Sequence, residues 1–97
     1  MKPINHIIRL LNSNEVDVCF VYFRDGSWGE CDYCNKELLI NKRLCTASRV
    51  TTLIHECLHF VYSTLNEDEI LTMEKEVYNA LTFDEMNFLR DFLRSKE

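Results

Sequence analysis

The chain has 97 residues, 46% of them hydrophobic and 28% charged, which predicts one compact domain over residues 1–97 with a single core. A net charge of −5 argues against a nucleic-acid-binding protein, because such a protein needs a basic face to displace counterions from phosphates. The sequence contains no run of about 18 apolar residues, which is the length that a membrane-spanning helix needs. Asn5, His6 and Arg9 interrupt the only segment that resembles a signal peptide, so we expect no membrane partner and a cytoplasmic location.

The first half of the chain predicts one helix and a small sheet. Residues 4–11 place apolar side chains at helical spacing. The β-branched and aromatic segment 16–23 predicts a strand, and the Asp-Gly pair at 25–26 predicts a turn into a return strand at 28–33. Residues 37–41, with the sequence ELLIN, predict a third strand. Three strands are enough for a sheet that helices cover on one face, so an α+β fold is expected.

Two further helices are predicted in the middle of the chain. Thr46 or Ser48 can cap the first, whose apolar side chains recur at three- and four-residue spacing. These apolar residues are Val50, Leu53, Ile54, Cys57, Leu58, Val61 and Leu65. Asn66 with Glu69 three positions later has the pattern of a capping box and predicts a second helix that ends near residue 81.

A terminal helix is predicted from the capping box at residues 82–85. Its apolar stripe is expected to consist of Phe83, Met86, Leu89 and Leu93, with Phe88 and Phe92 beside it. We expect this stripe to pack against the preceding helix, which brings the total to about four helices. Association through the two flanking phenylalanines is the alternative, so the chain is expected to be a monomer or a weak homodimer.

The helix predicted after Thr46 carries the motif H-E-x-x-H at residues 55–59. Residues four apart share a helix face, so His55 and His59 can direct ring nitrogens at one cation. Two imidazoles suit zinc and leave room for a third protein ligand and water. Glu56 is not needed as a ligand and can act as a general base. Alternatively, the histidines are ordinary half-buried residues, or the site holds Fe(II).

Glu74 is the predicted third ligand, because it interrupts the apolar stripe of the helix expected over residues 66–81. A carboxylate turned toward a core needs a partner or a metal, since an unpaired buried charge is costly. The alternatives are that Glu74 reaches the rim or pairs with an arginine, and that Glu76, Glu69 or Glu67 supplies the ligand.

The sequence HECLH on one helix, followed by an acidic helix with a glutamate, resembles the gluzincin branch of zinc metallopeptidases. The small size resembles the minigluzincins in particular, and the resemblance covers the chain from about residue 16 onward. It implies hydrolysis of peptide bonds in a cleft with a β-strand as its upper rim. By this resemblance His55, His59 and Glu74 hold Zn²⁺ and Glu56 is the general base. Some members are latent, with their own C-terminal segment over the cleft.

The predicted function is therefore zinc-assisted hydrolysis of a peptide or protein substrate. Tyr78, one helical turn beyond Glu74, is preferred to Tyr62 as an additional donor to the oxyanion. An extended substrate can add to the sheet edge as one more strand, with Trp28 and Tyr33 either lining side-chain pockets or packing in the core. The alternatives are a zinc hydrolase for another bond and a non-catalytic metal-binding regulatory protein of a phage or its host that binds a protein partner.

The five cysteines are Cys19, Cys31, Cys34, Cys45 and Cys57. They are expected to be reduced thiols. Cys31 and Cys34 form a C-x-x-C pair, but a structural zinc site would need a second pair and a thioredoxin-like site would need a βαβ unit. The pair is therefore interpreted as a coincidence of spacing on a hairpin.

Overall fold

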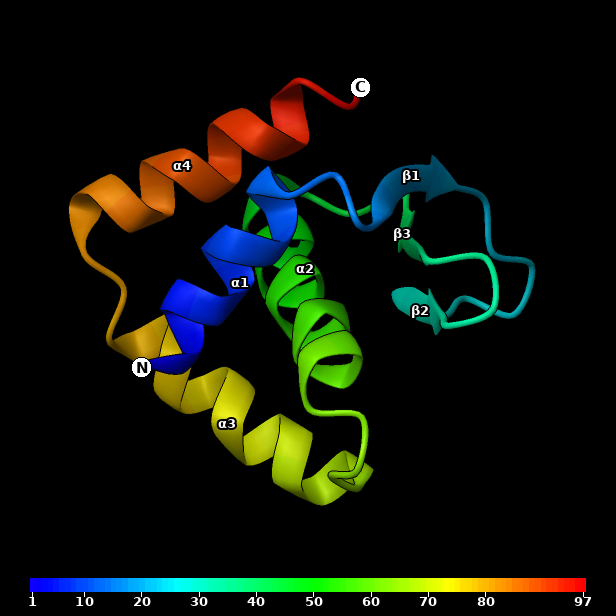
Figure 1. Ribbon diagram of the computed structural model, residues 1–97. Coiled ribbons are helices and arrows are strands. Elements are labelled where there is room, and N and C mark those ends of the chain that lie inside the picture. The colour runs from blue at the N-terminus through cyan, green and yellow to red at the C-terminus, as the bar shows by residue number, and fades with distance from the viewer.

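A three-stranded mixed sheet and four helices make up the computed structural model, which describes residues 1–97 (Figure 1). In chain order the elements are α1 (Pro3–Asn12), β1 (Asp17–Val21), β2 (Gly29–Asp32), β3 (Glu37–Asn41), α2 (Thr46–Val61), α3 (Glu67–Asn79) and α4 (Phe83–Arg94). This architecture confirms the predicted α+β class. None of the four helices combines the length and the apolar character that a membrane span requires.

The order of the strands differs from the prediction. The sheet runs β1-β3-β2, with β1 parallel to β3 and β2 antiparallel to it, so the expected hairpin between residues 16–23 and 28–33 is wrong. Gly26 does adopt a turn conformation, with φ of 79°, but the chain then continues to the far side of β3. The central place belongs to β3 because Leu38 and Ile40 are its completely buried residues, and the most buried strand gains most from neighbours on both edges.

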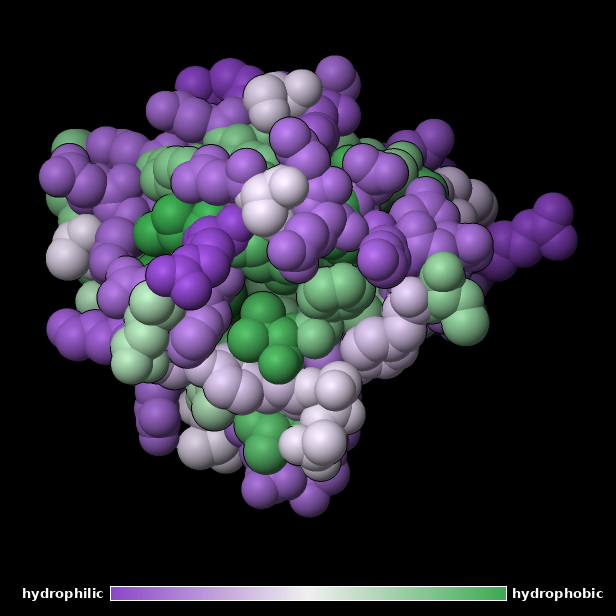
Figure 2. All heavy atoms as spheres, viewed as in Figure 1, coloured by the Kyte–Doolittle hydropathy of each residue, from purple (hydrophilic) through white to green (hydrophobic).

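Helix α2 is the central element of the fold. It contacts α1, α3 and α4 as well as β2 and β3, and Figure 1 shows the sheet on one side of it and the other helices on the opposite side. The predicted apolar stripe is confirmed for the five residues that are almost completely buried, which are Val50, Leu53, Ile54, Cys57 and Leu58. Figure 2, which has the same orientation as Figure 1, shows apolar side chains near the middle of the visible face of the molecule and mainly hydrophilic ones around its outline. The core therefore forms around α2, and the flanks of this helix are left to form a site.

Both predicted capping boxes are present. The Asn66 side chain accepts a hydrogen bond from the backbone N–H of Glu69, whose carboxylate accepts one from the backbone N–H of Asn66. Thr82 and Glu85 make the same reciprocal pair at the start of α4. These bonds satisfy backbone donors that a helix start leaves free, which is why both helices begin where the sequence predicts.

Helix α4 departs from the prediction in two ways. It packs on α2, with no comparable contact to α3, although α3 was its expected partner. Phe83 is 81% exposed, whereas Leu89 and Leu93 are buried. At 3.6 residues per turn, Phe83 lies about a quarter turn away from the stripe centred on these two leucines, so it faces solvent.

Candidate metal centre and its cleft

The two histidines of the motif lie on the flank of α2, next to its buried stripe. His55 and His59 are half-buried and come one turn apart, in the last part of the helix. Their Nε2 atoms are 3.2 Å from each other. Two nitrogens bound to one zinc ion at tetrahedral angles lie roughly 3.4 Å apart, so the histidine pair has a separation that fits such an ion.

Glu67 completes the group. Its two carboxylate oxygens lie 2.8 Å from His55 Nε2 and 2.9 Å from His59 Nε2. One ligand atom from each of these three residues lies within 4.8 Å of the other two, so His55, His59 and Glu67 can hold a metal ion. Two imidazoles and a carboxylate are donors that zinc and several other divalent metals accept, so the donor set fits a metal without identifying it.

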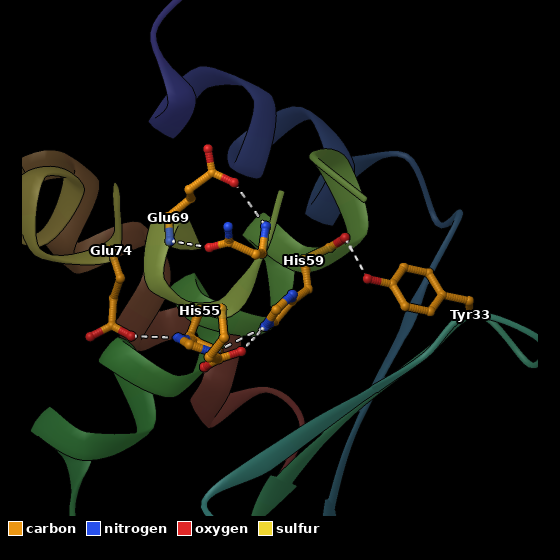
Figure 3. Close-up of polar contacts among 7 residues, drawn as sticks. Tyr33, His55, His59, Glu69 and Glu74 are labelled. Carbon is orange, nitrogen blue, oxygen red and sulfur yellow. Dashed lines mark hydrogen bonds and ion pairs between the residues drawn. The ribbon is translucent and has the colours of Figure 1, made fainter. Parts of the chain in front are cut away.

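Glu74 occupies a different place in the site. Its carboxylate accepts a hydrogen bond from the other ring nitrogen of His55, with 2.8 Å between His55 Nδ1 and Glu74 Oε1 (Figure 3). The Glu74 side chain is only 19% exposed, as its position inside the apolar stripe predicts. Glu74 thus bonds to the ring nitrogen that does not face Glu67. Carboxylates that orient a metal-binding histidine usually lie on this side of the ring.

The other two candidates for the third ligand lie elsewhere. The Glu69 carboxylate is engaged in the capping box with Asn66, as Figure 3 shows. Glu76 is exposed and lines shallow surface depressions away from the histidines. Glu67, the first residue of α3, is the candidate that reaches both Nε2 atoms, because the short connection after α2 returns the chain to the end of that helix.

The hydrogen bond between His55 and Glu74 affects the other ring nitrogen of His55. When His55 Nδ1 carries the proton donated to Glu74, the neutral ring has a lone pair on Nε2. Glu67 Oε1 lies 2.8 Å from this nitrogen and His59 Nε2 lies 3.2 Å from it. Acceptors that converge in this way repel each other unless a proton or a metal ion lies between them. The three side chains therefore form a site in which a shared proton or a metal ion can lie.

Glu56 projects into the same region and makes no contact with the three candidate ligands that would occupy its carboxylate. It is 7% exposed, and burial raises its pKa from an ordinary value of 4.5 to about 7, against the opposing effect of His55. The carboxylates of Glu67, Glu30 and Glu74 also raise this pKa. A carboxylate with a pKa near neutrality can both take up and release a proton under physiological conditions.

Glu56 lies in a cleft with a cavity volume of about 390 Å³. The floor of the cleft is the flank of α2 that carries His55 and Glu56. One wall consists of residues 27–29 at the start of the edge strand β2, and the other of Leu71 and Glu74 on α3. No residue of α4 lines the cleft, so the C-terminal helix does not cover it.

Gly29 sets the distance between β2 and the helix that carries the motif. A Cβ atom at this position would lie 2.6 Å from Thr52 Cγ2, 2.9 Å from the Leu39 carbonyl oxygen and 3.2 Å from Glu56 Cγ. Real Cβ atoms essentially never approach other atoms as closely as the first two of these distances, so glycine lets the edge strand lie directly against the helix that carries Glu56. The sequence did not indicate this role of Gly29, although a glycine inside a strand pattern can mark such a close approach.

Three tyrosines that the sequence offered as candidates lie in other environments. Tyr78 packs against the core and does not line the cleft, so the geometry gives no support to its role as an oxyanion donor. Tyr62 likewise lies outside the cleft, where its ring packs edge-on against His6. Tyr33 stacks on Phe60 and donates a hydrogen bond to the backbone carbonyl of His59 at 2.8 Å (Figure 3). This bond, which the sequence did not indicate, attaches the β2–β3 hairpin to the last turn of α2.

The C-x-x-C pair forms no metal group with a third ligand, and all five cysteines are free. Burial, with a contribution from Glu56, raises the pKa of Cys31 to about 11. A thiol with such a pKa is a poor nucleophile and metal ligand at neutral pH.

No protein-family model matches the chain, and no curated protein matches it. The inference of function therefore depends on the geometry of the metal group and the cleft.

Proposed function

We propose that the protein is a zinc-dependent peptidase of the gluzincin type. The observation that supports this proposal is the convergence of His55, His59 and Glu67 beside a cleft that also contains the buried carboxylate of Glu56. A protein that only binds a metal has no need for a shielded carboxylate with a pKa near 7 next to its ligands. A hydrolase needs such a group as a general base.

The three ligands in this proposal are His55, His59 and Glu67. Zinc bound there would supply a Lewis acid that polarises the scissile carbonyl and makes water more acidic. Glu74 holds the His55 ring through Nδ1, which fixes its orientation and directs the Nε2 lone pair toward the other ligands. Glu74, the ligand favoured by the sequence, is thus assigned an orienting role.

Glu56 is the proposed general base. Its carboxylate takes the proton from the attacking water and passes it to the amine that leaves. Burial favours this exchange, because it removes much of the preference of the carboxylate for its charged form.

The edge strand β2 is the proposed site of substrate binding. Its outer edge is unpaired, since β3 occupies only one side, and residues at its start line the cleft. An extended peptide can therefore add to β2 through main-chain hydrogen bonds, with its scissile bond above Glu56. Because Gly29 carries no side chain, β2 lies directly against the helix that carries Glu56.

The assignment of ligands can be tested with alanine variants of Glu67, Glu74 and Glu76. Zinc content and affinity are measured by elemental mass spectrometry and by competition with a chromogenic chelator. Loss of Glu67 should abolish stoichiometric binding, and loss of Glu74 should weaken affinity by about 10- to 100-fold, as for other groups that orient a ligand. The exposed Glu76 serves as the control and should have no effect.

The assignment of catalysis is tested with Glu56→Gln. The zinc-loaded variant should retain its metal and lose hydrolysis of a mixture of fluorogenic peptides. Equal rates for the zinc-loaded wild type and this variant would contradict the peptidase proposal, even if zinc binding were confirmed.

A further inference from the structure

Two large apolar side chains are exposed within the proposed cleft. Trp28 and Leu71 are 55% and 39% exposed, and they are the only large apolar residues that line it. Trp28 comes from the sheet wall and Leu71 from the α3 wall, with the flank of α2 as the floor between them. Apart from Gly29, all the other lining residues are polar or ionisable.

The remaining exposed aromatic residues near the sheet have partners, and Trp28 does not. The Arg43 guanidinium lies 4.6 Å from the centre of the Tyr22 ring. Tyr33 stacks on Phe60 and donates its hydroxyl proton to the protein. Trp28 has no stacking partner of either kind and makes no side-chain hydrogen bond, so its indole face is free for a ligand.

Leu71 on α3 is also exposed in the cleft and available to a ligand. Leu71 follows the completely buried Ile70, which anchors the helix in the core, and it lies one turn from both Glu67 and Glu74. It thus places an apolar surface on the helix face that carries the metal-site carboxylates. An exposed apolar side chain among charged groups is most useful where a ligand covers it.

The charge of the cleft restricts the ligand further. No lysine or arginine lines it, whereas Glu56 and Glu74 do, and the carboxylates of Glu30 and Glu67 are close enough to Glu56 to act on its charge. A carboxylate on the ligand would meet several like charges in a partly desolvated site without a compensating cation from the chain.

We infer that the cleft selects a large apolar side chain, held between Trp28 and Leu71, on a ligand without a negative charge beside it. The inference rests on the proposed zinc centre and specifies the substrate class that this centre would accept. A cavity of about 390 Å³ has room for one such side chain with its peptide unit. Trp28 and Leu71 are thus specificity-determining residues.

Small zinc-binding hydroxamates provide the test, because they separate metal binding from contact with the apolar residues. Calorimetry on the zinc-loaded protein compares three probes: acetohydroxamate, a phenylpropionyl hydroxamate and the same phenyl compound with a para-carboxylate. The phenyl group should improve affinity by about tenfold or more, since burying a ring between two apolar side chains gains at least that much. The added carboxylate should remove most of this gain.

Leu71→Ala and Trp28→Ala should each lose most of the phenyl gain and leave the affinity for acetohydroxamate unchanged. Both residues are exposed, so neither change should unfold the chain. Phe83→Ala removes an exposed apolar residue outside the cleft and is the matched control. Trp28 is also the only tryptophan, so its fluorescence should change when the phenyl probe binds to the wild type.

The outcomes distinguish this inference from the proposed function. If acetohydroxamate binds and the phenyl group adds nothing, the apolar subsite is refuted and the zinc centre stands. A phenyl gain that survives both substitutions refutes the assignment to Trp28 and Leu71. If the protein takes up no zinc and acetohydroxamate does not bind, the zinc centre fails and this inference fails with it.

Discussion

The burial of Glu56 has a measurable consequence for the stability of the metal-free protein. In the folded chain its pKa is about 7, against an ordinary value of 4.5. Because the folded state holds the proton more tightly than the unfolded state, ionisation of Glu56 opposes folding. Its contribution to the free energy of unfolding therefore falls as the pH rises from about 4.5 to about 7, and is constant above that range.

The size of the effect follows from the difference between the two pKa values. One pKa unit corresponds to about 1.4 kcal/mol, so the difference between 4.5 and about 7 corresponds to about 3 kcal/mol. Glu56→Gln has no such ionisation and should gain about this amount relative to the wild type between pH 4 and pH 8. Low exposure of the side chain leaves little solvent to reduce the effect.

Urea denaturation of both proteins in the presence of a chelator is the appropriate assay. A change of about 3 kcal/mol should move the difference between their midpoints by about 1 to 3 M urea across the pH range. Comparison of the two proteins at each pH cancels the titration of groups that they share. Glu76→Gln is the control, because Glu76 is exposed and lines surface depressions away from Glu56, so its loss should change the difference little. A wild-type-to-variant difference that is independent of pH would refute the argument that Glu56 is desolvated.

Three further predictions concern residues that shape the site. Gly29→Ala should cost about 1–3 kcal/mol in urea denaturation, because its methyl would lie 2.6 Å from a side chain of α2; unchanged stability would contradict the close packing. Asn66→Ala should cost about 1 kcal/mol through loss of the cap and should also weaken zinc binding, since the cap fixes the helix start that bears Glu67. Tyr33→Phe should keep the ring stack and lose the hydrogen bond to the His59 carbonyl. It should cost about 1 kcal/mol with little change in the far-ultraviolet circular dichroism spectrum, and no loss of stability would show that the bond contributes nothing.

Local chemistry explains why the helices could be predicted and the strand pairing could not. Asn66 and Thr82 define helix starts through hydrogen bonds to residues three positions away, so a short stretch of sequence contains every residue of each capping box. A strand pattern shows that a segment is extended and does not show which segment lies beside it. The burial of Leu38 and Ile40 decides that β3 is central, and this burial depends on α2 and on the other two strands together.

The metal site shows the same division between local and long-range information. The histidine pair could be predicted because its spacing is a property of one helix. The stripe of α3 correctly indicated that Glu74 turns inward and finds a partner, which is His55 Nδ1. Nδ1 is the ring nitrogen that does not face His59 and Glu67, and nothing in the sequence distinguishes the two nitrogens as partners of Glu74. Glu67 reaches Nε2 through the path of the connection between α2 and α3, which no local pattern encodes.

The two carboxylates on α3 differ in a way that suits different roles in one site. Glu74 is 19% exposed and bonded to His55, so its position is fixed before any metal arrives. Glu67 is 60% exposed at the first turn of the helix, where its side chain can move without disturbing the core. A metal ion that enters would meet one imidazole already oriented and one carboxylate free to adjust. Because the ligands come from the end of α2 and the start of α3, such an ion would also cross-link the two helices that form the floor and one wall of the cleft.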